Sequence, residues 1–266
     1  LNDQLTELDL TPVPGLKTLE IEHDSGYIDL DIDLTPVPEL TTLIVSSMGK
    51  FDLAPVPGLK ILDFIYMDVT YFDLTRVPGL TELHCRENQL TDLDLSPVPG
   101  LTTLDCSCNQ LSDLDLTPVP GLTTLSCGGN PWLTNLDLTP VPGLTTLNCG
   151  GNNQLKKLDL SPVPGLTTLS CRGNKQPKKT PLKCRHNWLT HLDLTPVPGL
   201  TTLDCSHNWL THLDLTPVPG LTTLSCYRNY GLAKLDLTPV PGLETLFCDE
   251  RVKLTGAPRN LKVTPS

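Results

Sequence analysis

Helix-compatible sequence is what this chain lacks most clearly. Proline accounts for 26 of the 266 residues, and a proline inside an α-helix costs about 3 kcal/mol. The prolines recur too often for helices of ordinary length, so we expect essentially no α-helix. A run of about 18 apolar residues, the length that spans a bilayer as a helix, is also missing. We therefore expect no membrane insertion of this fragment.

Basic residues are scarce as well. The chain has 19 Lys and Arg against 30 Asp and Glu, which gives a net charge of −11. Binding to nucleic acid depends on Lys and Arg contacts to phosphate, so we exclude nucleic acid as a partner. An apolar–Asp–Leu tripeptide precedes each Pro-Val-Pro-type segment, and its aspartates alone equal the acidic excess (30 − 11 = 19). These eleven residues are Asp9, Asp33, Asp52, Asp73, Asp94, Asp115, Asp137, Asp159, Asp193, Asp214 and Asp236.

What the chain has instead is a repeat. A segment built on Pro-Val-Pro-Gly-Leu recurs eleven times, mostly 21 or 22 residues apart. One unit, 101–121, reads LTTLDCSCNQLSDLDLTPVPG and fits the leucine-rich repeat pattern. Leu104 and Cys106 alternate with polar residues, which predicts a half-buried strand. After a turn at Asn109, residues 114–116 predict a short back-side strand, and the prolines favour an extended backbone.

Stacking such units predicts a β-rich solenoid. We expect a leucine-rich repeat horseshoe or rod of about 12 coils, with one parallel β-sheet on the concave face, short back-side strands and extended PVPG segments. Residues 1–251 are assigned to this repeat domain, and residues 252–266 to a C-terminal cap or a frayed tail. Only 13 residues separate Cys171 from Cys184, so we expect a shortened coil near 171–184.

Cysteine and asparagine hold fixed positions in the repeat. Nine of the ten cysteines stand in the third apolar position of the strand, where earlier repeats carry Ile21, Val45 and Phe64. Because plain hydrophobic residues replace it, we interpret this cysteine as a small core residue with a free thiol. The asparagine three residues later can donate and accept hydrogen bonds, so it can bridge consecutive coils. The predicted structural ladders are Cys85, Cys106, Cys127, Cys149, Cys171, Cys184, Cys205, Cys226 and Cys248, and Asn88, Asn109, Asn130, Asn152, Asn174, Asn187, Asn208 and Asn229.

Motifs of catalysis and metal binding are missing. The chain has no GxSxG, HExxH, Walker or CxxC motif. We predict no enzyme, no catalytic residue, no cofactor and no metal site. Calcium bridging of the aspartates stays open as an alternative to hydrogen bonds with the following Thr or Ser, although each coil offers only one carboxylate and calcium takes six to eight oxygens.

The outward strand positions are the candidate binding surface, because solenoids bind partners on their concave face. These positions are small and polar in the central repeats and become basic or aromatic toward the C-terminus. Aromatic residues and Arg are typical of binding hot spots. Alternatively, the tryptophans cover neighbouring turns, and the basic stretch 171–185 is either a docking loop for an acidic protein or glycan or a partly deleted repeat. The candidate partner-binding residues are Lys183, Arg185, His186, Trp188, His207, Trp209, Tyr227, Arg228, Tyr230 and Phe247.

The segments LTDLDLSPVPGLTTLDCSCNQL and LTHLDLTPVPGLTTLSCYRN resemble the cysteine-containing leucine-rich repeats of bacterial internalins. The resemblance covers roughly residues 1–251. It implies a secreted or cell-surface bacterial protein that serves adhesion or virulence by binding a host or cell-surface protein or glycan, with its signal and anchor outside this fragment. We expect a monomer. The alternatives are a purely structural spacer for another domain and, more remotely, an ice-binding array of threonines.

Overall fold

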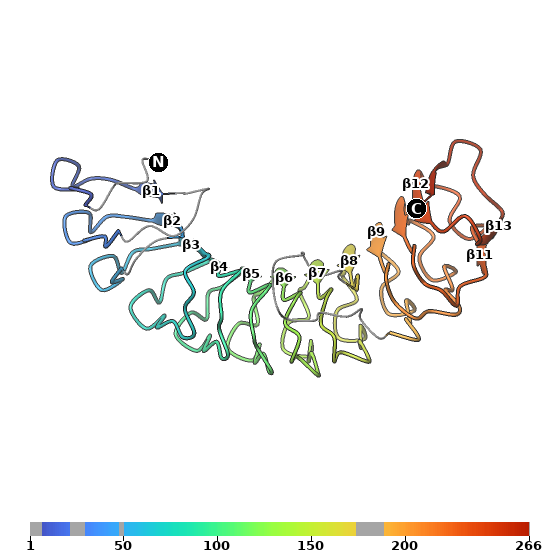
Figure 1. Ribbon diagram of the computed structural model, residues 1–266, viewed down its shortest axis with the longest axis horizontal. Helices are drawn as coiled ribbons and strands as arrows, with labels where there is room; N and C mark the ends of the chain where they lie inside the picture. The colour runs from blue at the N-terminus through green and yellow to red at the C-terminus, as the bar shows by residue number, and fades with distance from the viewer. Residues whose placement is uncertain (1–6, 22–29, 48–50, 174–188, 266) are drawn as a thin grey trace.

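The computed structural model of the chain describes residues 7–21, 30–47, 51–173 and 189–265. In these residues the chain forms a curved solenoid whose strands lie along the inner side of an arc, and no helix is present in them (Figure 1). The strands are β1 (Thr18–Ile21), β2 (Thr42–Ser46), β3 (Ile61–Ile65), β4 (Glu82–His84), β5 (Thr103–Asp105), β6 (Thr124–Ser126), β7 (Thr146–Asn148), β8 (Thr168–Ser170), β9 (Thr202–Asp204), β10 (Thr223–Ser225), β11 (Lys234–Asp236), β12 (Thr245–Cys248), β13 (Lys253–Thr255) and β14 (Lys262–Pro265).

Twelve of the strands form one parallel sheet, in the order β1 to β10, then β12 and β14. The pairing aligns the same repeat position in every coil, so that Leu83 pairs with Leu104 and Leu104 with Leu125. These leucines are fully buried, whereas the residues that alternate with them face outward. The period-2 pattern of the sequence thus places one leucine row in the core and the polar row on the concave face.

The back of the solenoid is less regular than the sequence predicted. In the described residues only β11 and β13 form a back-side strand pair, and Ile32 and Phe51 form an isolated bridge. The PVPG segments make tight turns rather than extended backbone: Val98 N–H donates to Leu95 O at 3.0 Å, and Leu101 N–H donates to Val98 O at 3.1 Å. The fixed φ of proline suits such turns.

The coil between β8 and β9 corrects a prediction. The sequence placed a strand with Cys184 between the strands of Cys171 and Cys205, but Thr168 on β8 pairs directly with Thr202 on β9. The sheet of the described residues therefore has no position for a strand between β8 and β9, where the sequence predicted the strand of Cys184. Cys184, Asn174 and Asn187 themselves lie outside the described residues.

The chain after residue 251 continues the solenoid. Strand β13 extends the back side by pairing with β11, and β14 extends the concave sheet by pairing with β12. Val263 on β14 aligns with the fully buried Leu246 but is itself 45% exposed. The described tail thus forms a last coil whose inward side chains are only partly covered.

The cysteine ladder lies in the core. The eight described ladder cysteines are buried and free of disulfide bonds: Cys85, Cys106, Cys127, Cys149, Cys171, Cys205, Cys226 and Cys248. Burial raises the pKa of Cys149 to about 12 and raises that of its neighbours as well, because a thiolate is poorly solvated there. Cys108, off the ladder, is half-buried and also free of a disulfide. The ladder thiols therefore stay protonated and act as small apolar side chains.

The asparagine ladder joins each coil to the preceding one. The Nδ2 of Asn109 donates to the carbonyls of Cys106 in its own coil, at 3.1 Å, and of Cys85 in the preceding coil, at 2.9 Å. Its Oδ1 accepts the N–H of Leu90, also in the preceding coil, at 3.0 Å. Asn88, Asn208 and Asn229 repeat this arrangement. Each side chain satisfies buried backbone groups that the turn would otherwise leave unpaired.

The aspartate ladder shapes the entry to each PVPG turn. In all eleven coils the carboxylate accepts the backbone N–H of the residue two positions later, as Asp115 does from Thr117 at 2.9 Å. Asp236 also accepts the hydroxyl of Thr238, at 2.7 Å. These bonds stabilise the charged form, and the threonine hydroxyl is the larger cause that lowers the pKa of Asp236 and Asp115. Each of the aligned carboxylates is thus fixed by hydrogen bonds within its own turn.

The thiols provide a test of the core. In a Cys184→Ser variant, we expect a thiol-reactive disulfide reagent to label only Cys108 in the folded protein, and the eight described ladder thiols to react after unfolding in urea. The reason is that burial keeps the ladder thiols protonated and inaccessible. Rapid labelling of several thiols without urea would contradict a closed ladder.

Removing one ladder asparagine should weaken the solenoid. Asn130 is fully buried, and its Oδ1 accepts Leu111 N–H at 3.1 Å while its Nδ2 donates to Cys106 and Cys127. We expect Asn130→Ala to lower the free energy of unfolding by about 2–3 kcal/mol, since it leaves buried backbone groups unpaired. The exposed Asn135 is the matched control, and Asn135→Ala should change stability by less than about 0.5 kcal/mol in the same urea titration. Equal effects of the two variants would refute the bridging role.

The aspartate turns predict acid sensitivity. A carboxyl whose folded pKa lies below the ordinary 3.8 adds stability above that value, and this stability is lost as the pH falls through the folded pKa. We expect unfolding of the chain to become easier below about pH 4. We also expect Thr238→Val to move the pKa of Asp236 up toward 3.8, as measured by NMR titration of its carboxyl carbon. An unchanged pKa of Asp236 in this variant would show that the hydrogen bond from the Thr238 hydroxyl does not stabilise the charged carboxylate.

Candidate functional site

The concave sheet presents two rows of outward side chains. In the first row seven threonines follow one another without interruption from β5 to β12, in direct register: Thr103, Thr124, Thr146, Thr168, Thr202, Thr223 and Thr245. The second row reads Asp105, Ser126, Asn148 and Ser170 from β5 to β8. The middle of the face is therefore a band of small hydrogen-bonding groups, and larger side chains lie only toward its two ends.

Three aromatic and basic side chains meet where β8, β9 and β10 end. The guanidinium carbon of Arg172 lies 5.4 Å from the ring centre of Tyr227, within cation–π distance. The ring of His207 meets the same tyrosine edge-on, with 4.9 Å between the ring centres. Tyr227 therefore contacts both a cation and an imidazole, and we call these three residues the aromatic–basic cluster.

The repeat explains why these side chains can meet. Arg172, Ser206 and Tyr227 each follow the ladder cysteine of three successive coils. Ser206 is fully buried, and its hydroxyl lies 2.6 Å from that of Ser225. Because the middle position of the three holds a small side chain, Arg172 and Tyr227 can approach each other across it.

A second set of contacts extends the cluster toward the C-terminal rim. The carboxylate of Asp249 accepts the backbone N–H of Arg228 at 2.8 Å and lies 3.6 Å from the guanidinium of Arg251. The same guanidinium lies 4.9 Å from the ring centre of Tyr230 and donates to Asn229 O at 3.3 Å. Arg251 stands where the regular coils carry the ladder asparagine. It thus joins the end of that ladder to an exposed aromatic ring.

The structure places the remaining sequence-predicted residues as follows. Phe247 lies outward on β12 and is 36% exposed, in register with Ser225 on β10. Trp209 and Tyr230 follow the ladder asparagines of consecutive coils, and both are more than half exposed. His207, by contrast, is almost fully buried, and its ring contacts that of Tyr227. The other predicted residues, Lys183, Arg185, His186 and Trp188, lie outside the described residues.

Arg172 and Arg251 were not among the individually predicted partner-binding residues, although Arg172 lies in the basic stretch 171–185, for which a docking loop was one of two alternatives. Arg172 shares its repeat position with Tyr227, and that signal was present in the sequence. The predicted extra strand after Cys171 would have moved the two residues apart by one more coil, and only the direct pairing of β8 with β9 brings them together. For Arg251 the sequence signal was a basic residue three positions after the ladder cysteine, where the other coils carry an asparagine.

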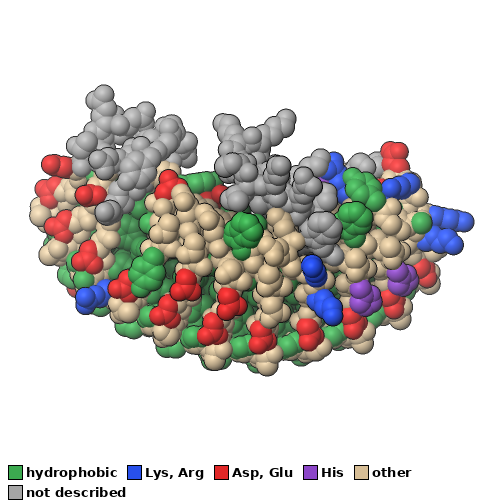
Figure 2. Space-filling model, turned by 60° about the horizontal axis from the view of Figure 1, so that its bottom comes forward, with side chains coloured by type: hydrophobic (Ala, Val, Ile, Leu, Met, Phe, Trp, Pro, Cys, Tyr) green, Lys and Arg blue, Asp and Glu red, His purple; other side chains and the backbone are tan. Residues whose placement is uncertain are grey.

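The opposite surface carries a charge gradient. Asp and Glu side chains extend along the face shown in Figure 2, while the histidines and most Lys and Arg side chains lie in its C-terminal half. The residue two positions before each ladder aspartate changes accordingly, from Asp92 and Asp113 to Lys157, His212 and Lys234. In the C-terminal coils each of these groups accompanies a ladder aspartate of its own coil. Lys157 and Lys234 thus accompany carboxylates of opposite charge, which disfavours a site for a free anion.

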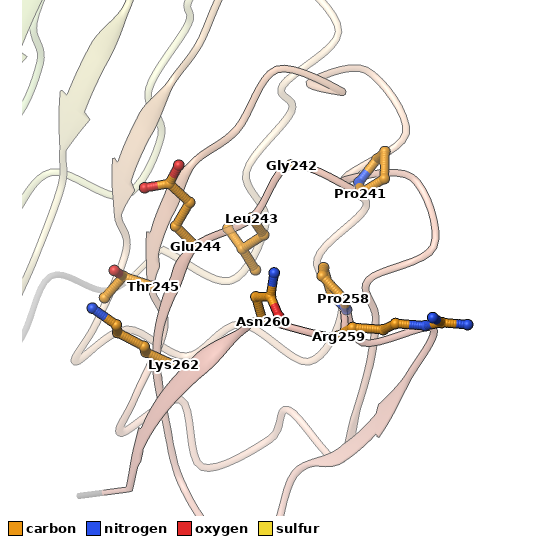
Figure 3. A pocket seen from close by; sticks show the side chains of 9 residues that line it. All are labelled: Pro241, Gly242, Leu243, Glu244, Thr245, Pro258, Arg259, Asn260 and Lys262. Atoms are coloured by element: carbon orange, nitrogen blue, oxygen red, sulfur yellow. The ribbon is translucent and has the colours of Figure 1, made fainter.

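A pocket of about 490 Å³ opens beside the last coil, lined by residues 241–245, 258–260 and Lys262. Its charged side chains do not converge: Glu244 and Arg259 point away from each other, and Lys262 lies beside Thr245 (Figure 3). This arrangement offers no focused contact for a charged ligand. The pocket is therefore a weaker candidate than the aromatic–basic cluster.

Metal-binding and membrane-spanning groups are both missing from the described chain. Among residues 7–21, 30–47, 51–173 and 189–265, no group of three or more His, Cys, Asp or Glu is arranged to hold a metal ion. In the same part of the chain, no helix is long and apolar enough to cross a membrane.

Comparison with known proteins gives a family match and several related structures. A family model for leucine-rich repeats (2 copies) matches residues 78–118. The functional domain of InlJ from Listeria monocytogenes, which includes a cysteine ladder, is 27% identical with a TM-score of 0.67, over 94% of this chain and 61% of that one. YopM from Yersinia enterocolitica WA-314 is 26% identical with a TM-score of 0.70, over 98% of this chain and 57% of that one. This chain thus spans about three-fifths of their lengths.

A third structure, the internalin InlF from L. monocytogenes, is 20% identical with a TM-score of 0.59, over 90% of this chain and 73% of that one, and shows the shared fold. No curated protein sequence matches the chain significantly. The repeat, the cysteine ladder and these likenesses agree. The chain therefore has a leucine-rich repeat fold, and its repeats and cysteine ladder are similar to those of the internalin InlJ.

Proposed function

We propose that the chain is a non-enzymatic interaction module of a secreted or cell-surface bacterial protein. It binds a protein or glycan on a cell surface through its concave face, with the aromatic–basic cluster and the adjoining C-terminal rim at the centre of the contact. The leucine-rich repeat fold is itself a protein-interaction fold, and the likeness to InlJ and InlF supports the surface setting. Adhesion is the role that follows from such a contact.

The observation that carries the proposal is the contact of Tyr227 with both Arg172 and His207. Aromatic and Arg side chains dominate binding energies when they are fixed in place before the partner arrives. Here the tyrosine ring is oriented by two neighbours, and Arg251 similarly covers the ring of Tyr230. Phe247 adds an exposed apolar ring on β12. Such preordered rings lose little conformational freedom on binding, which favours recognition over a purely structural role.

Binding should depend on these rings. We expect the purified chain to bind epithelial cells or members of a glycan array, and Tyr227→Ala/Phe247→Ala to weaken that binding by at least about tenfold, since each lost anchor typically costs more than 1 kcal/mol. Flow cytometry with labelled protein and the array together distinguish protein from glycan ligands.

The matched control is Tyr71→Ala/Trp132→Ala, which removes two rings that are 64% and 49% exposed in other coils. This variant should bind like the wild type, and both variants should keep the melting temperature of the wild type within a few degrees. Equal loss in both pairs would show that the cluster is not the centre of binding. A wild-type chain that binds nothing would instead support the spacer alternative.

A further inference from the structure

The N-terminal coils carry a second group of outward side chains that differs from every other part of the described sheet. On β3, Ile61, Asp63 and Ile65 alternate with buried residues and therefore share the outward face. Ile44 on β2 pairs with Asp63, which places a third isoleucine beside them. All four are half-buried rather than covered. We call these residues the isoleucine patch.

The same outward positions are polar in the coils that follow. Ile61 is in register with Glu82 and, one strand further, with Thr103, while Asp63 is in register with His84 and then Asp105. The regular coils thus show that Thr and Ser suffice for the fold at these positions. The isoleucines on the outward face of the sheet lie outside the core, and apolar residues that are grouped and left partly exposed in this way mark contact surfaces.

Charge around the patch has one dominant sign. Glu20 on β1 pairs with Ile44, and Glu82 on β4 pairs with Ile61. With Asp63 in the middle, three carboxylates lie among the three isoleucines. Among the described residues, the exposed Arg86 that follows β4 is the group of opposite sign at the edge of the patch, and the imidazole of His84 lies 4.0 Å from Glu82. The surface is therefore apolar and net acidic.

Next to the patch stands an exposed aromatic residue. Tyr66 follows Ile65, is 53% exposed and has a φ of 56°. The equivalent positions of other coils have the same left-handed backbone and hold residues as different as Glu87, Gly129 and Arg228. The turn therefore does not require an aromatic residue, and Tyr66 adds an exposed ring beside the patch.

We propose that the isoleucine patch is a second docking surface, which takes a protein segment in which apolar side chains alternate with Lys or Arg. The apolar side chains of such a segment cover Ile44, Ile61 and Ile65, and its cations face Glu20, Asp63 and Glu82. Complementary charge selects a basic segment over an acidic one. This surface lies on β1 to β4 and is separate from the aromatic–basic cluster, so it does not depend on the function proposed for that cluster.

The probes are three fluorescein-labelled peptides of about nine residues, in which Leu alternates with Lys, Ser with Lys, or Leu with Glu. Fluorescence anisotropy is measured with the 266-residue chain. We expect micromolar binding of the Leu–Lys peptide, at least about tenfold tighter than of either other peptide, and weaker binding as salt concentration rises. Equal binding of the Ser–Lys peptide would overturn the proposal, because net charge alone would then account for it.

The variant Ile61→Thr/Ile65→Ser introduces the residues that the regular coils carry, so the fold should be kept, as checked by circular dichroism and a melting curve. We expect it to weaken binding of the Leu–Lys peptide at least tenfold. Asp63→Ser should weaken it as well, whereas Asp115→Asn, which removes the same charge from the aspartate ladder, should not. Unchanged binding by the isoleucine variant would refute the surface.

Two controls test whether the peptide binds elsewhere and whether the patch joins two copies of the chain. Tyr227→Ala/Phe247→Ala should bind the Leu–Lys peptide like the wild type, and a loss there would assign the peptide to the C-terminal cluster instead. Analytical ultracentrifugation at rising concentration measures self-association through the patch. Self-association that Ile61→Thr/Ile65→Ser abolishes would overturn the heterologous partner proposed here.

Discussion

The structure depends on one constraint: the buried backbone groups in the turn after each strand must find partners. A coil cannot satisfy them alone, so the asparagine of the following coil does, as Asn109 does for the carbonyl of Cys85 and the N–H of Leu90. Each coil is therefore completed by its successor, which is the physical basis of a one-dimensional fold. In the coil of β12 the asparagine position holds Arg251, whose guanidinium donates to Asn229 O in the preceding coil.

Because leucine, cysteine and asparagine hold the coils together from inside, the outward positions are free to vary. The structure uses this freedom unevenly. Isoleucine and carboxylates occupy the first strands, Thr, Ser and Asn the middle, and tyrosine, arginine and phenylalanine the last. The core rows show no such gradient: Leu83, Leu104 and Leu224 are equally buried. Recognition and stability are thus assigned to different side chains of the same strand, and a change in one need not disturb the other.

The periodic positions made most of the fold predictable. Spacing alone identified the parallel sheet, the leucine rows and the bridging place of Asn109, because each depends on local pattern and stacking. The coil after Cys171 was not predictable, since LKCRHN at 182–187 repeats the order of leucine, cysteine and asparagine that marks a strand elsewhere. The pairing of β8 with β9 depends on how the coils stack in three dimensions, and without it the contact of Arg172 with Tyr227 could not be predicted. The isoleucine patch was not predictable either, because the early repeats are irregular in length and only the register of β2 with β3 brings Ile44 beside Asp63.

Distance along the sheet limits what one partner can do. Six strand steps separate β4 from β10, roughly 29 Å at ~4.8 Å per step. A partner that contacts both the isoleucine patch and the aromatic–basic cluster must therefore extend over this distance, as a folded domain can. The band between the two sites has few large side chains that would obstruct such a domain. At Gly128 and Gly150 no side chain fits, because neighbouring coils approach so closely that a Cβ would meet backbone atoms of the next coil. Large outward side chains lie only at the two ends of the sheet. The contacts that make such a partner specific must therefore be made at these ends, whereas the middle of the sheet only has to fit the partner's surface.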